Sequence, residues 1–212
     1  MNTNLDLDML LKNLSCKTKS QDIPPNSLSI VSSFLQQEHL ARQQYRLARL
    51  FASCGVQQKQ IKTFDQFDWH FNPKMPKEDI LAFRNSDWVG QAANLILIGD
   101  TGLGKSHIAK ALCYEAIVKG YSTYFISTFD LLSKIKKAAH PASKIDYYGK
   151  TVKVLCLDEL GYVYHQKEDT DLLFQIISKR TESLPTIVTT NLVPKNWGSI
   201  SPAQLLLPSW IA

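Results

Sequence analysis

The sequence feature that most constrains the fold is the octapeptide GDTGLGKS at residues 99–106. It fits G-x-x-x-x-G-K-[ST], the phosphate-binding loop, in which glycines let the backbone curl so that successive N–H groups point at an anion. In this pattern Lys105 places a positive charge on the β- and γ-phosphates, and the Ser106 hydroxyl is a ligand for Mg²⁺. The candidate nucleotide-binding residues are the loop and the histidine that follows it: Gly99, Asp100, Thr101, Gly102, Leu103, Gly104, Lys105, Ser106 and His107.

The flanks of the loop support the same interpretation. The apolar run 94–98 suits a buried strand, and 105–119 has the apolar spacing of a helix that ends at Gly120. The N-terminus of that helix would meet the phosphates. We therefore expect a nucleoside triphosphate site.

Two further strand ends carry polar groups. The apolar segment 152–157 is followed by Asp158 and Glu159, and the segment 186–190 is followed by Asn191. If both strands are parallel to 94–98, these groups reach the sheet edge that holds the loop. Asp158 would then hold Mg²⁺, Glu159 would polarise the attacking water, and Asn191 would orient it. An ordinary turn is the alternative for Asp158 and Glu159, and Asn191 by itself is a weak signal because Thr-Asn is common at strand ends.

The order of elements predicts the fold class, an α/β P-loop NTPase with a three-layer αβα arrangement and a parallel sheet. Strands at 94–98, 122–126, 152–157 and 186–190 alternate with helices at 105–119, 128–138 and 169–182. We expect a leader and basic helical region over 1–60, a linker over 61–93 and the ATPase core over 94–212. Aromatic residues in the linker either pack on a base or, as we favour, pin the linker to the core: Phe64, Phe67, Trp69 and Phe71.

Composition limits the class of partner. The 212 residues carry a formal charge of +5, which permits nucleic acid as a partner. Four scattered cysteines and the lack of a long apolar run predict a reducing, cytoplasmic setting without a membrane span. Two groups of basic residues are candidates for duplex DNA, with a solvated surface as the alternative: Arg42, Arg46 and Arg49 on a long helix or helix pair predicted over 26–53, and Lys134, Lys136 and Lys137.

The segments GDTGLGKSHIAKAL, VLCLDELGY and TIVTTNL resemble the IstB-like transposition-helper ATPases of insertion sequences, a family of the AAA+ class related to DnaC-type helicase loaders. The resemblance covers about residues 28–198. It implies ATP and Mg²⁺ as cofactors, Ser106 and Asp158 at the metal, Glu159 as the catalytic carboxylate and Asn191 as the polar sensor. It also implies duplex DNA, a partner transposase and an ATP-dependent homo-oligomer.

The chain departs from the family pattern at its C-terminal end. Residues 192–212 contain no arginine, whereas the family continues into a helical region that carries an arginine for a neighbour's ATP. We expect a truncated or frame-shifted end, an absent lid and weak hydrolysis, since such arginines contribute about 10³–10⁵ in turnover.

The function expected from these features is that of an ATP-binding helper of DNA transposition. The nearest alternative is a DnaC-like replicative helicase loader, which shares the core motifs and differs in its partner. A small-molecule or nucleotide kinase is a third candidate, and a non-hydrolysing remnant that still binds nucleotide and partner is a fourth.

Overall fold

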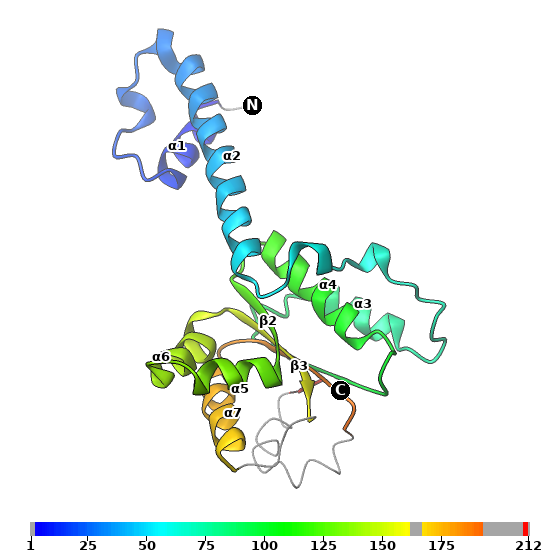
Figure 1. The fold of residues 1–212 in the computed structure, drawn as a ribbon. Coiled ribbons are helices and arrows are strands. Elements are labelled where there is room, and N and C mark those ends of the chain that lie inside the picture. The colour runs from blue at the N-terminus through cyan, green and yellow to red at the C-terminus, as the bar shows by residue number, and fades with distance from the viewer. Residues whose placement is uncertain (1–2, 162–166, 193–209, 212) are drawn as a thin grey trace. The chain divides into compact units, whose positions relative to one another are not determined.

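The computed structural model describes residues 3–161, 167–192 and 210–211 of the chain. These residues belong to two compact units, 1–49 and 50–212. Figure 1 shows a helical N-terminal unit and a second unit in which helices surround a sheet. Each unit is described by itself below.

The N-terminal unit consists of two helices and short 3₁₀ turns. Helix α1 spans Thr3–Asn13, and helix α2 spans Leu28–Ser53, continuing past the boundary between the units. We predicted a long helix or a helix pair over 26–53, and this segment forms the single helix α2 from Leu28 onward. The predicted leader is more ordered than its polar composition suggests, because Leu7, Leu11 and Leu14 are buried with Leu35 of α2. Their spacing places them on one face of the segment, which is what a helix needs to pack.

The linker packs against the apolar core of the second unit. Two 3₁₀ turns, Gln58–Gln60 and Phe64–Gln66, precede helix α3 at Lys77–Asn85. Phe64 is buried, and Phe67 and Trp69 pack against the same apolar cluster, as we favoured from the sequence. Phe71 is different, because two thirds of its surface remains exposed.

The second unit is built on a parallel sheet. Its strands are β1 (Asn94–Ile98), β2 (Thr123–Ser127), β3 (Val154–Leu160), β4 (Thr186–Thr190) and β5 (Trp210–Ile211), in the spatial order β2-β3-β4-β1-β5. Every recorded pair of neighbouring strands is parallel. The helices are α4 (Lys105–Val118), α5 (Thr128–Lys136), α6 (Pro141–Asp146) and α7 (Lys167–Arg180), with a π-helical turn at Tyr147–Thr151.

Alternate residues of the interior strand β3 enter two different cores, which makes the unit three layers thick. Val154 and Cys156 of β3 pack into the cluster that contains α4, whereas Leu155 and Leu157 pack into the cluster that contains α5 and α7. This alternation follows from the two-residue period of a strand. The predicted α/β three-layer fold is confirmed.

Strand β3 differs most from its predicted bounds. We predicted 152–157, but the strand begins at Val154 and continues to Leu160. Its start is delayed because the carbonyls of Val152 and Lys153 accept hydrogen bonds from the buried Arg180. Because the strand continues to Leu160, Asp158 and Glu159 lie inside it, whereas we had predicted that they follow its end.

Three of the four cysteines are buried, and Cys16 is exposed. Cys113 and Cys156 are buried core residues, and burial raises the pKa of the Cys156 thiol well above its ordinary value. Within the described ranges, no helix is both long and apolar enough to cross a membrane.

The expected departure from the family pattern after residue 192 falls almost wholly on positions 193–209, which lie outside the described residues.

Candidate functional site

The phosphate-binding loop connects β1 to α4 at the carboxyl edge of the sheet. Gly102 and Gly104 adopt φ values of 86° and 88°, in the left-handed region that favours glycine. A Cβ atom on Gly104 would also lie 2.7 Å from the ring of Phe67, so the linker leaves room for glycine alone. The fixed glycine of the motif is therefore required by both the backbone and a neighbouring side chain.

The lysine and serine of the motif take the places that the pattern predicts. Lys105 Nζ donates hydrogen bonds of 2.7 Å to the carbonyls of Gly99 and Asp100, so the ammonium group lies over the loop. Ser106 Oγ donates to Asp158 Oδ1 at 2.7 Å. A hydroxyl and a carboxylate from segments 52 residues apart thus meet at one point.

That pair of oxygen groups fits a hard divalent cation. Mg²⁺ prefers one or two protein oxygens and completes its shell with water and substrate phosphates. Asp158 is largely buried and Glu159, the next residue, is exposed at the strand end. Ser106 and Asp158 would hold the metal, which would neutralise phosphate charge when bound.

A polar cavity of about 290 Å³ collects the predicted site residues. From the loop it is lined by Thr101, Gly102, Gly104, Lys105, Ser106 and His107, and from the strand ends by Glu159, Thr189, Thr190 and Asn191. We predicted from the sequence that the loop, the acidic pair and Asn191 meet at one sheet edge, and the cavity contains members of all three. Thr189 was not among the predicted site residues, because in the sequence it is only one of several threonines in an expected strand.

His107 faces the linker as well as this cavity. Its Nε2 lies 2.9 Å from the carbonyl oxygen of Thr63, and its ring packs edge-on against Phe67 with 5.0 Å between centroids. We had placed His107 among the nucleotide-binding residues. Its side chain lines the cavity, and its contacts also join the start of α4 to the linker.

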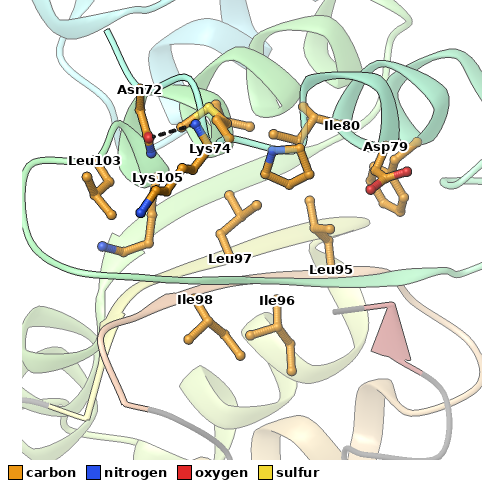
Figure 2. A pocket seen from close by; sticks show the side chains of 14 residues that line it. Asn72, Lys74, Asp79, Ile80, Leu95, Ile96, Leu97, Ile98, Leu103 and Lys105 are labelled. Carbon is orange, nitrogen blue, oxygen red and sulfur yellow. Dashed lines mark hydrogen bonds between the residues drawn. The ribbon is translucent and has the colours of Figure 1, made fainter. Parts of the chain in front are cut away.

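A second, apolar cavity of about 520 Å³ adjoins the other side of the loop (Figure 2). Figure 2 shows Leu95 and Leu97 on one side of β1 and Ile96 and Ile98 on the other, with Leu103 and Lys105 at one end. Residues 72–83 of the linker and α3 form the opposite wall. Its volume is in the range of pockets that hold small organic ligands.

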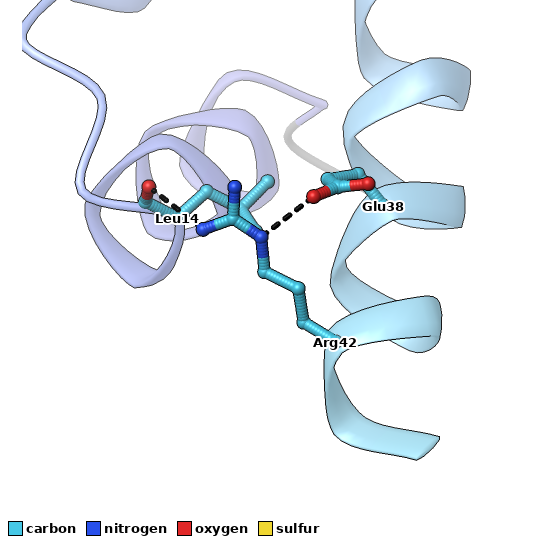
Figure 3. Close-up of polar contacts among 3 residues, drawn as sticks. All are labelled: Leu14, Glu38 and Arg42. Atoms are coloured by element: carbon cyan, nitrogen blue, oxygen red, sulfur yellow. Dashed lines mark hydrogen bonds and ion pairs between the residues drawn. The ribbon is translucent and has the colours of Figure 1, made fainter. Parts of the chain in front are cut away.

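The candidate DNA-binding arginines lie on α2, where Arg42 and Arg49 contact neighbouring residues of the same unit. Arg42 Nε donates to Glu38 Oε1 at 2.6 Å, and Arg42 Nη1 donates to the Leu14 carbonyl at 3.4 Å (Figure 3). Arg49 lies 5.9 Å from the ring centroid of Tyr45. We had not expected the contact between Arg42 and Glu38, which lies one helical turn away.

The candidate lysines of α5 also differ from one another. Lys134 donates to the Tyr124 hydroxyl at 3.0 Å, and Lys136 forms an ion pair with the buried Asp169 of α7. Lys137 is exposed, and no ion pair joins it to another described residue. The structure therefore gives the three lysines unequal freedom to contact a ligand.

Comparison with known proteins identifies relatives by sequence. The chain matches the family described as IstB-like ATP binding protein over residues 2–206. It is 38% identical over 142 residues to a protein described as ATP-binding in insertion sequence IS232 of Bacillus thuringiensis subsp. berliner, covering 66% of this chain and 56% of that protein. It is 30% identical over 146 residues to a similarly described IS21 protein of Pseudomonas aeruginosa, covering 66% and 54%. The chain thus spans a little over half the length of these relatives.

Solved structures confirm the fold. The crystal structure of DnaI superposes with a TM-score of 0.59 at 21% identity, covering 73% of this chain and 90% of that one. DnaA from Aquifex aeolicus, solved with AMPPCP bound, gives a TM-score of 0.58 at 18% identity, covering 70% and 49%. The AAA+-type P-loop fold predicted from the motifs is therefore present in this chain.

Proposed function

Because the chain belongs to the family of IstB-like ATP-binding proteins, we propose that it is an ATP-dependent helper of DNA transposition. In this proposal the protein binds ATP with Mg²⁺, assembles on duplex DNA as a homo-oligomer and regulates a partner transposase. The observation that carries the nucleotide part is the hydrogen bond between Ser106 and Asp158, which unites the phosphate loop and the acidic strand.

The two cavities beside the loop suit the two ends of a nucleotide. The polar cavity has Lys105 and Ser106 for phosphates, and Glu159 at its rim for activation of water. The apolar cavity on the other side of Lys105 has the lining and volume that a purine base requires. ATP would thus extend across the loop, with its phosphates over the N-terminus of α4.

The DNA part of the proposal is supported by charge and by the relatives. The formal charge of +5 favours a polyanion, and phosphate contacts of this kind are independent of sequence and sensitive to salt. The relatives found by sequence are described as proteins of insertion sequences, which favours transposition over helicase loading. A helicase loader would use the same nucleotide site with another partner.

The test is fluorescence anisotropy of a labelled duplex with the full chain, in the presence of ATP, of ADP or of no nucleotide. We expect salt-sensitive binding with ATP that is lost in Lys105→Ala. Lys119→Ala is the matched control, because it removes the same charge just past the other end of α4. Equal binding of the duplex with and without nucleotide would contradict the proposal that ATP controls DNA binding. Loss of binding in both variants would show that the net charge of the protein, and not the nucleotide site, determines DNA binding.

A further inference from the structure

Strand β3 carries a β-bulge at the acidic pair. Leu157 pairs with Val188 of β4, and the next recorded pair is Leu160 with Thr190, so three steps on β3 match two on β4. Glu159 lies inside this irregularity with φ of 59°. A glutamate rarely adopts this left-handed conformation, which persists only where the surroundings hold it. The bulge explains how two consecutive residues of a strand both serve one edge site.

The hydroxyl of Thr189 holds both members of the acidic pair. It accepts a hydrogen bond of 3.0 Å from the backbone N–H of Glu159, and it donates one of 2.5 Å to Asp158 Oδ1. Thr189 is buried, with 1% of its surface exposed, so water does not substitute for it freely. The same Asp158 oxygen accepts the hydrogen bond from Ser106.

We propose that Thr189 is a positioning residue for the metal and water site, acting through the Asp158 carboxylate and the Glu159 backbone. The inference rests on the proposed function, since the site it serves is that of Mg²⁺ and ATP. One hydroxyl accepts the hydrogen bond of the Glu159 N–H inside the bulge and at the same time holds the Asp158 carboxylate. It therefore links the metal-binding oxygen to the backbone of the residue whose carboxylate activates water.

The competing explanation is that Thr189 is an ordinary β-branched residue of a buried strand. Valine has nearly the same shape and suits a strand equally well, so that explanation predicts little change in the site on Thr189→Val. The hydroxyl explanation predicts an unpaired Glu159 N–H and an Asp158 carboxylate free to rotate. Residues that orient metal ligands by hydrogen bonding typically change metal affinity by about 10–100-fold when replaced.

The experiment titrates Mg²⁺ into the full chain with a fixed concentration of a fluorescent ATP analogue and records the Mg²⁺ concentration at half-maximal binding. We expect this midpoint to rise by about 10–100-fold in Thr189→Val. Thr189→Ser keeps the hydroxyl and should return the midpoint close to that of the unmodified chain. Thermal unfolding of each variant without nucleotide reports separately on stability.

Thr186→Val is the matched control. Thr186 lies on the same strand, is as buried as Thr189 and bonds to Arg180 instead of the acidic pair. Thr186→Val should lower the melting temperature, because it removes the hydrogen bond from Arg180, and it should leave the Mg²⁺ midpoint unchanged. An unchanged midpoint in Thr189→Val, or a shifted one that Thr189→Ser does not restore, would overturn the inference alone. Failure of the unmodified chain to bind the analogue at any Mg²⁺ concentration would overturn the proposed function and the inference with it.

Discussion

The buried arginine of α7 gives a prediction whose size follows from its contacts. Arg180 is 1% exposed, and burial lowers the pKa of its guanidinium to about 9, which still leaves it charged at pH 7. Its recorded partners are neutral oxygens: the carbonyls of Tyr148 (2.7 Å), Val152 (2.8 Å), Lys153 (3.0 Å) and Pro185 (2.6 Å), and Thr186 Oγ1 (3.0 Å). The side chain thus joins the π-helical turn to the starts of β3 and β4.

Replacing Arg180 with methionine keeps the aliphatic bulk and removes all five hydrogen bonds. Hydrogen bonds to charged groups contribute about 1.5–3 kcal/mol each, but the buried cation also carries a desolvation cost of several kcal/mol. Because four carbonyls lose this partner, we expect the net loss to resemble that of a broken buried network, about 3–5 kcal/mol. For a chain of this size about 1 kcal/mol corresponds to about 2–4 °C, so the melting temperature should fall by about 6–20 °C.

The assay is thermal unfolding followed by circular dichroism. Lys179→Met is the control, because it makes the same kind of change at the adjacent position, where the lysine forms a partly exposed ion pair with Asp146. Such a pair contributes about 0–1 kcal/mol, so this variant should melt close to the unmodified chain. If Arg180→Met melts within about 3 °C of Lys179→Met, the hydrogen bonds do not outweigh the cost of burying the charge, and the reasoning is wrong.

Three further predictions concern the loop, the lysines and the thiols. Gly104→Ala should weaken nucleotide binding at least about tenfold, because strain of about 1–3 kcal/mol at its positive φ adds to a clash with the linker; unchanged affinity in a titration would contradict this. Lys136→Gln should lower the melting temperature, because it leaves the buried Asp169 unpaired. Lys137→Gln should leave the melting temperature unchanged. It should weaken binding to unrelated duplexes equally and reduce the slope of log affinity against log salt concentration by about 0.9. A thiol reagent should label Cys16 alone in the native chain and all four cysteines after unfolding, because the other three are buried; rapid labelling of a second thiol would argue against the packed core.

Local sequence patterns determined most of the fold and the composition of the nucleotide site. Strands 94–98 and 186–190 have their predicted bounds, because each is a short run dominated by apolar or β-branched residues and ended by a turn or a polar residue. The glycines of the loop could also be predicted from the sequence, because a backbone with positive φ favours glycine, which has no Cβ atom. The order of elements then placed the loop, Asp158, Glu159 and Asn191 at one edge, because parallel strands share their carboxyl ends.

Only the tertiary structure decided which side chains form hydrogen bonds and ion pairs between different strands and helices. The bulge in β3 depends on register against β4, and the hydroxyl of Thr189 gains its role only when those strands lie side by side. Likewise, the sequence does not distinguish Lys136 from other surface lysines, because its partner Asp169 lies on a different helix, α7. Periodicity specifies which face of an element is buried, but hydrogen bonds and ion pairs between elements depend on distances of a few ångströms between residues far apart in the chain, and no local pattern encodes those distances.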